Sequence, residues 1–127
     1  MTESLTIVLP IPNKVLSPNC MTGSIGGRMM KAQAAKKCRR LAKEAVEAED
    51  ICTRPWKFVD VSPYYFHKDK RRRDEDNFQA MLKGTYDGIV DAGLVLDDDS
   101  LHMHKHTPTF LVDKENPRVE IVIERVV

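Results

Sequence analysis

The sequence predicts an α+β fold, a single domain with two main helices and a mixed β-sheet in the order β-α-β-α-β-β. Three observations predict this class. Both ends of the chain alternate in the manner of strands, two internal segments have apolar residues three and four positions apart, and an aromatic run lies between them. The 127 residues fit one domain spanning 1–127.

The first part of the chain is predicted to form a strand, a loop and a long helix. Residues 5–9 alternate as a strand does, and Pro10 and Pro12 end it because proline cannot donate to a β-ladder. Residues 13–24 are rich in Pro, Asn, Ser and Gly, which is typical of a loop. Helical spacing of apolar residues predicts a helix over 27–49.

A second strand is predicted over 56–66, where aromatic residues are frequent. Pro63 indicates an edge position or a bulge in this strand. We expect the aromatic side chains in the core rather than as platforms for stacked bases. The aromatic residues expected on one face are Trp56, Phe58, Tyr64 and Phe66.

A second helix is predicted over 77–91, and Gly93 lies where a helix C-cap belongs. Asp76, Lys83 and Asp87 are expected on the face opposite the apolar one, with Lys83 and Asp87 paired at i, i+4. The apolar face consists of Phe78, Met81, Leu82, Thr85 and Ile89.

The remaining residues predict two or three strands. They lie near 101–103, over 110–112 and over 119–123, and the residues 114–117 are a plausible hairpin connection between the last two.

Composition indicates an ordinary soluble protein. The net charge is +1, so any nucleic-acid binding must come from local patches rather than from the overall field. No apolar run reaches the roughly eighteen residues of a membrane span, and the start does not resemble a signal peptide. Cys20, Cys38 and Cys52 form no recognisable framework and are expected to be reduced thiols. We therefore predict a cytoplasmic protein without a membrane partner.

The charges of the first predicted helix are unevenly placed. Between Ser24 and Lys43 there are seven basic residues, among them Lys31 and Lys36, and no acidic one. Cations near a helix N-terminus oppose the macrodipole. An anionic partner would explain this arrangement, and an accidental solvated face is the alternative.

The segment 71–99 carries the most informative chemistry. Asp74 and Asp76 would point to the same side of an extended backbone, within reach of one hard cation. Mg²⁺ prefers such oxygen ligands, and one of Asp97–Asp99 would supply a third. Lys83 would stabilise developing charge, and Lys70 with Arg71, Arg72 and Arg73 would grip phosphates.

Structural roles are the alternative for the same residues. Asp76 or Asn77 would then cap the helix, and the charged side chains would pair on the surface. His102, His104 and His106 would share one strand face, as a Zn²⁺ site or as a polar face. No Cys or carboxylate stands at a recognisable ligand spacing from them.

The central residues also resemble a known family. The run Arg71-Arg72-Arg73-Asp74-Glu75-Asp76-Asn77, followed by Lys83, Asp87, Ala92-Gly93 and Leu96-Asp97-Asp98, resembles the signature of RusA-type Holliday junction resolvases of phages and prophages. Pro10-Ile11-Pro12 and Leu16-Ser17-Pro18-Asn19 are similar to the N-terminal loop of phage-type members.

This resemblance implies a homodimeric, Mg²⁺-dependent endonuclease acting on four-way DNA junctions. It implies that Asp74, Asp76 and Asp98 bind the metal with Asp97 beside them, and that Lys83 is catalytic. Two alternatives remain open. One is a catalytically inactive protein that binds branched DNA, and the other is a nuclease of the same fold acting on flaps or other replication intermediates.

Overall fold

The computed structural model describes residues 3–20, 23–50 and 55–127, so Cys52 lies outside the described residues. The predicted α+β class and mixed sheet are confirmed. Among the described residues, no helix has the length and apolar character needed to cross a membrane. The elements are β1 (Ser4–Leu9), a 3₁₀ helix η1 (Lys14–Leu16), α1 (Ile25–Ala48), β2 (Val59–His67), α2 (Glu75–Ala80), α3 (Lys83–Asp91), β3 (Met103–Lys105), β4 (Thr109–Val112) and β5 (Arg118–Arg125).

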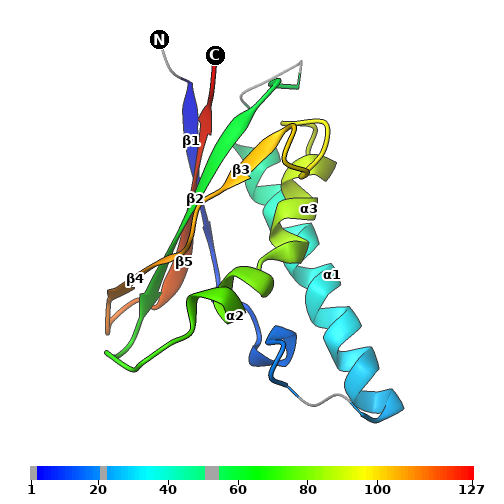
Figure 1. Ribbon diagram of the computed structural model, residues 1–127, viewed down its shortest axis with the longest axis vertical. Helices are drawn as coiled ribbons and strands as arrows, with labels where there is room; N and C mark the ends of the chain where they lie inside the picture. Colours follow the sequence, from blue (N-terminus) through cyan, green and yellow to red (C-terminus); the bar gives the residue numbers. More distant parts are fainter. Residues whose placement is uncertain (1–2, 21–22, 51–54) are drawn as a thin grey trace.

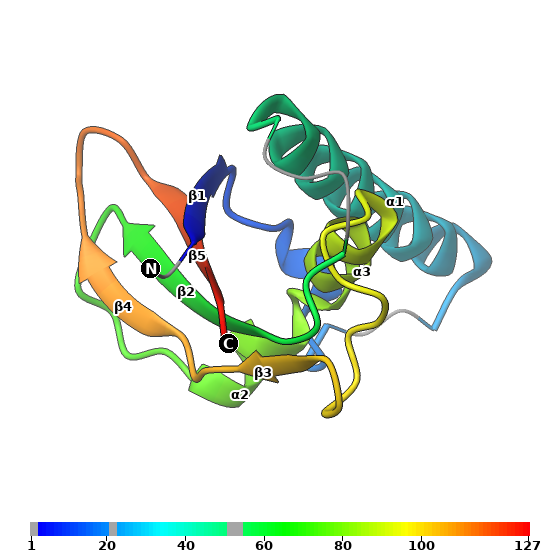
Figure 2. The same ribbon diagram turned by 90° about the horizontal axis from the view of Figure 1, so that it is seen from above.

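The sheet is built around β2. Strand β5 lies between β1 and β2 and is antiparallel to both, whereas β3 and β4 pair one after the other with the opposite edge of β2, parallel to it. Helices α1 and α3 lie on one side of this sheet (Figures 1 and 2). The predicted hairpin at 114–117 is wrong, because β4 and β5 flank β2 on opposite sides and do not pair with each other.

The predicted buried face of β2 is also wrong. Every second residue from Val59 to His67 is buried, whereas Tyr64 and Phe66 lie on the opposite, half-exposed face. Trp56 is buried, but it precedes β2 and forms a bridge with Val95. A large aromatic side chain favours burial, which is why the sequence predicts the wrong face. Phe66 is instead covered outside the core by the Arg118 guanidinium, 4.0 Å from its ring centroid.

Pro63 lies in a central strand rather than at an edge or in a bulge. Odd-numbered residues of β2 exchange backbone hydrogen bonds with the β3–β4 side, as Val61 and His67 do by accepting from His106 and Asp113. The nitrogen of Pro63 therefore faces this side. The neighbouring chain passes there from β3 to β4 without a ladder pair, so the missing N–H of proline costs no backbone hydrogen bond.

The helix predicted over 77–91 is two helices. Leu82 leaves helical geometry with φ −92° and ψ 4°, and its N–H donates to the Gln79 carbonyl three residues back. Met81 and Leu82 are both buried at this break, which gives the break a packing reason. The predicted apolar face is otherwise confirmed, and Gly93 has the positive φ of 85° expected of a residue that ends a helix.

Helices α1 and α3 pack so closely that two positions of α3 require glycine. A Cβ on Gly84 would lie 2.7 Å from the Ala35 carbonyl oxygen, and one on Gly88 only 2.2 Å from that of Arg39. At the far end of the contact, Arg39 Nη2 donates to Asp91 Oδ1 over 2.8 Å. The packing of α1 against α3 fixes the basic helix along the length of α3.

Gly88→Ala should destabilise the fold by about 3 kcal/mol or more, because α1 must move away to make room for the methyl group. Chemical denaturation measures this change. Gly26→Ala is the matched control: it is also helical, its Cβ would meet nothing within 4 Å, and it should stabilise by up to about 1 kcal/mol. Equal stability of the two variants would contradict the packing argument.

His67 is buried in a cluster with Tyr65, Phe78 and Phe110. Its Nε2 has no hydrogen-bond partner among the described residues. Burial lowers the pKa of His67, the nearby Arg73 lowers it further, and Asp69 opposes them. The imidazole is therefore neutral in the folded protein at neutral pH.

Stability should accordingly fall as the pH drops below about 6.5, where the unfolded imidazole takes a proton that the folded one resists. This contribution to the free energy of unfolding is fully present above that pH and is lost as the pH falls toward the lowered pKa of His67 in the folded state. Urea unfolding between pH 8 and pH 5 measures this loss. His67→Phe should flatten the dependence, and an unchanged slope in that variant would rule out His67 as its source.

Candidate functional site

The candidate site centres on a contact between Lys83 and Asp98. Lys83 is the first residue of α3, and its Nζ donates to Asp98 Oδ2 over 2.7 Å and to Asp87 Oδ1 over 3.0 Å. Lys105 of β3 approaches the same Asp98 oxygen at 3.3 Å. The structure thus confirms the predicted Lys83–Asp87 pair and joins it to Asp98 of the acidic run Asp97–Asp99.

Burial explains why Asp98 holds two lysines. Its side chain is only 13% exposed, so its charge needs partners. Burial alone would raise the pKa of Asp98, but the Lys83 hydrogen bond and the Lys105 charge hold it below its ordinary value. Asp98 and Asp87 in turn raise the pKa of Lys83. At neutral pH the pair is therefore a carboxylate and an ammonium.

Asp74 and Asp76 do not form the extended i, i+2 pair that the sequence suggested. Asp74 is the N-cap of α2, and its Oδ1 accepts from the backbone N–H of Asp76 at 2.9 Å. Asp76 already lies in the first helical turn, so its side chain does not follow strand alternation. Asp76 is exposed and makes no hydrogen bond or ion pair through its side chain with another described residue.

The predicted metal ligands do not converge within coordination distance. Among the described residues, the one group of three His, Cys, Asp or Glu side chains with ligand atoms within 4.8 Å of one another is Asp60, His104 and His106. Asp74, Asp76 and Asp98 form no such group. Asp97 lies beside Asp98, as predicted, and its Oδ1 accepts from the Asp98 N–H at 2.7 Å.

The basic segment before α2 divides into a structural part and an exposed part. Arg73 is largely buried and binds both the side chain and the carbonyl of Asp69, at 2.9 and 3.1 Å, so it holds the turn after β2. Arg71 is exposed but pairs with the same carboxylate at 3.1 Å. Lys70 and Arg72 are exposed and make no ion pair with another described residue.

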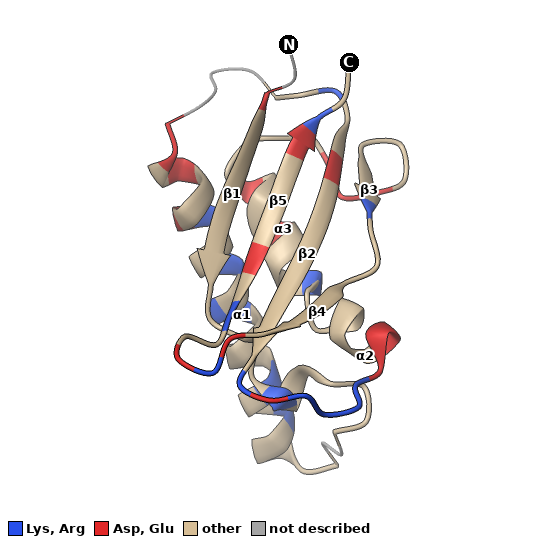
Figure 3. Cartoon of the chain, turned by 90° about the vertical axis from the view of Figure 1, so that its left-hand side faces the viewer, with Lys and Arg blue, Asp and Glu red and all other residues tan. Residues whose placement is uncertain are grey.

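A groove of about 480 Å³ runs between α1 and the α2–α3 break. Lys31 and Lys36 line one wall, and Lys83 lines the other. The charged residues of the lining are Arg28, Lys31, Lys36, Arg39, Lys83 and Asp87. Figure 3 shows that the basic half of α1 and the basic segment before α2 lie at the same end of the molecule.

Two of the three predicted histidines lie together, with a carboxylate that the sequence did not reveal. His104 and His106 both approach Asp60 of β2, whereas His102 pairs with Asp99 across 2.6 Å. Asp60 precedes His104 by 44 residues, and only the parallel pairing of β2 with β3 brings them opposite each other.

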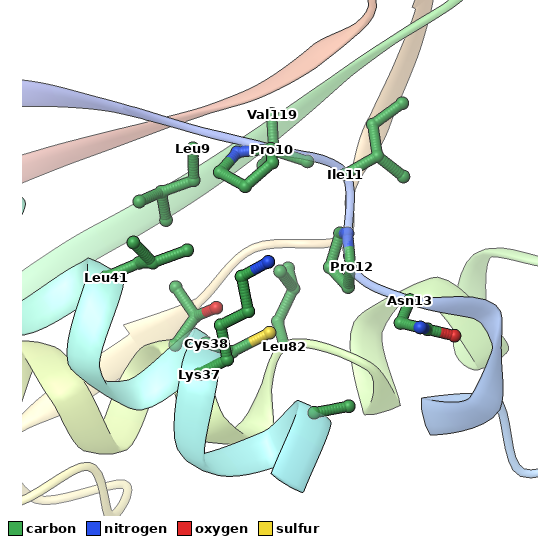
Figure 4. Close-up of a pocket in the computed structure, with 12 residues that line it drawn as sticks. Leu9, Pro10, Ile11, Pro12, Asn13, Lys37, Cys38, Leu41, Leu82 and Val119 are labelled. Atoms are coloured by element: carbon green, nitrogen blue, oxygen red, sulfur yellow. The ribbon is translucent and has the colours of Figure 1, made fainter. Parts of the chain in front are cut away.

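A second cavity, of about 260 Å³, lies between the end of β1 and α1 (Figure 4). Its lining is mostly apolar and includes Leu9, Ile11 and Leu41. Burial raises the pKa of the Cys38 thiol at its wall, although Lys37 opposes this. Cys38 is therefore protonated and not activated as a nucleophile.

No model of a known protein family matches the sequence, and the curated proteins contain no match to it. The likeness to RusA-type resolvases therefore depends on the sequence motifs, and what it implies about activity remains a proposal.

Replacing Lys83 with Met should raise the pKa of Asp98, because Lys83 supplies its closest cationic hydrogen bond. Carboxyl-carbon NMR titration in metal-free buffer measures the change. Lys36→Met is the matched control, since Lys36 lines the same groove without contacting Asp98. An equal rise in both variants would mean that Asp98 senses the charge of the groove rather than Lys83.

Proposed function

We propose that this chain is a Mg²⁺-dependent endonuclease that resolves four-way DNA junctions. The observation that carries the proposal is the Lys83–Asp98 contact at 2.7 Å, at a groove whose other wall carries Lys31 and Lys36. Lys83 and Asp98, which the resemblance places in one active site, thus lie beside a surface suited to a phosphate backbone.

DNA binding is the first element of the proposal. Lys31 and Lys36 have no ion-pair partner among the described residues, so their charges are available to phosphates. Lys70 and Arg72 would add contacts at the same end of the molecule, with Arg71 released from Asp69. Arg73 would position this segment rather than bind DNA, because its guanidinium is already occupied.

Lys83 is suited to electrostatic stabilisation rather than to proton abstraction. Its two carboxylate partners keep it charged, and a fixed ammonium stabilises the charge that develops on a phosphate during hydrolysis. Asp98 and Asp87 hold the ammonium in place. Lys105 would help to neutralise Asp98 while the fixed Lys83 ammonium also faces a phosphate.

The donor chemistry of the acids fits Mg²⁺. Asp76 has no side-chain partner among the described residues, and Asp74 and Asp98 each use one carboxylate oxygen in their contacts, so oxygen ligands remain. Because the three do not converge, Mg²⁺ would be held by one or two carboxylates and several waters, its usual mode in proteins, with Asp97 as an accessory. When bound, Mg²⁺ supplies a more acidic water and neutralises the scissile phosphate.

A homodimer belongs to the same proposal. A four-way junction has approximate twofold symmetry and needs two cuts, and a twofold dimer presents two equivalent sites. One chain, with one groove, would make one of the two cuts.

Purified protein should cleave a synthetic four-way junction in Mg²⁺ and not in EDTA. Asp76→Asn, Asp98→Asn and Lys83→Met should each lower the cleavage rate by about a hundredfold or more. Glu115→Gln is the control, because this exposed carboxylate lies in the turn before β5 and makes no side-chain contact with another described residue. Gel electrophoresis of labelled strands measures the rates.

The same experiment separates the alternatives. Junction binding without Mg²⁺-dependent products would identify a binding protein and would refute the enzyme. Equal cleavage of flaps and junctions would identify a broader nuclease. Equal rates for wild type and Asp76→Asn would refute the assigned site.

A further inference from the structure

The geometry points to a second metal site, for a divalent transition ion such as Zn²⁺, formed by Asp60, His104 and His106. This inference is independent of the proposed nuclease activity. The three side chains lie on the face of the sheet that α1 and α3 do not cover, since the buried residues of β2 and β3 point to the helices and Asp60 and His104 alternate with them.

Backbone pairing fixes the three ligands. Asp60 lies directly opposite His104 in the parallel β2–β3 ladder. The N–H of His106 donates to the Val61 carbonyl over 2.9 Å, so the register continues one residue beyond β3 and places His106 on the same face as His104. The Gln79 side chain also donates to the His106 carbonyl at 2.9 Å, which fixes this segment from the helix side.

The distances suit the ligands of one tetrahedral metal ion. Asp60 Oδ1 is 3.2 Å from His104 Nδ1 and 3.4 Å from His106 Nε2. Ligand bonds of roughly 2.0–2.1 Å place the corners of a zinc tetrahedron about 3.3 Å apart. Charge-assisted hydrogen bonds are shorter, at about 2.7–2.9 Å. The two imidazole rings lie 4.2 Å apart, and all three ligand atoms lie within 4.8 Å of one another.

The ligand types select the ion. Two imidazoles and one carboxylate suit Zn²⁺, Co²⁺ or Ni²⁺, whereas Mg²⁺ prefers oxygen ligands only. The side chains of His104 and His106 are 59% and 43% exposed, so an ion can enter and water can complete the coordination. Three protein ligands with an open fourth position are the pattern of an accessible zinc site.

Such an ion would secure β3, which contributes only three residues to the sheet. Lys105, between the two histidines, points to the other face and contacts Asp98. A metal on the open face would therefore hold the strand that carries one of the two lysines on Asp98.

Zn²⁺ titration by calorimetry, in buffer containing Mg²⁺, should reveal one site per chain. Asp60→Asn, His104→Gln and His106→Gln should each weaken binding by more than about tenfold. His102→Gln is the matched control, because His102 pairs with Asp99 and lies outside the cluster. The affinity of the His102→Gln variant for Zn²⁺ should therefore equal that of the wild type. Equal weakening in His102→Gln, or unchanged binding in Asp60→Asn, would overturn the assignment, as would the absence of Zn²⁺ binding by the wild type.

A second measurement needs no variant. In imidazole NMR spectra of the wild-type protein, Zn²⁺ should shift the signals of His104 and His106 and leave those of His67 and His102 in place. Added Zn²⁺ should also raise the melting temperature, since an ion that binds only the folded state stabilises it. Shifts at all exposed histidines, without a change in melting temperature, would indicate adventitious binding and would refute the site.

Discussion

The close contact between α1 and α3 is the constraint on which the rest of the structure depends. Gly84 and Gly88 lack the Cβ atoms that would collide with backbone oxygens of α1, so the two helices approach closely. That approach places Lys31 and Lys36 across a groove from Lys83.

Alternation along β3 separates two kinds of chemistry on the two faces of the sheet. Lys105 points to the helix side and contacts Asp98, while His104 and His106 point to the open side and contact Asp60. A three-residue strand thus links both candidate sites. Side-chain contacts also join the two sites. Gln79 donates to the His106 carbonyl and accepts from the Tyr86 hydroxyl, and the Lys105 ammonium lies over the Tyr86 ring.

Local patterns predicted much of the fold, and pairings between distant segments set the limit. β1 and α1 follow from their spacing, and the Lys83–Asp87 pair follows from helical geometry. The break after α2 contains no proline or glycine to mark it, so nothing in the sequence signals it. The buried face of β2 differs from the predicted one because side-chain size is a weaker guide than the register that β5 imposes. Two contacts of the candidate sites do not follow from local patterns. The Lys83–Asp98 contact depends on the path of the loop before β3, and the Asp60–His104 contact depends on a parallel ladder between residues 44 positions apart.

The distribution of charge separates binding from chemistry in the proposed enzyme. Lys83, Lys105, Asp87 and Asp98 form a cluster of two cations and two anions, which balances internally. Arg39 is neutralised by Asp91. The excess positive charge of the groove therefore resides on the N-terminal half of α1, where no acidic residue occupies the first turn and the macrodipole adds to it. An arrangement that costs the isolated helix stability would become favourable with a phosphate backbone against it, and in the proposed enzyme the balanced cluster would then act on that backbone.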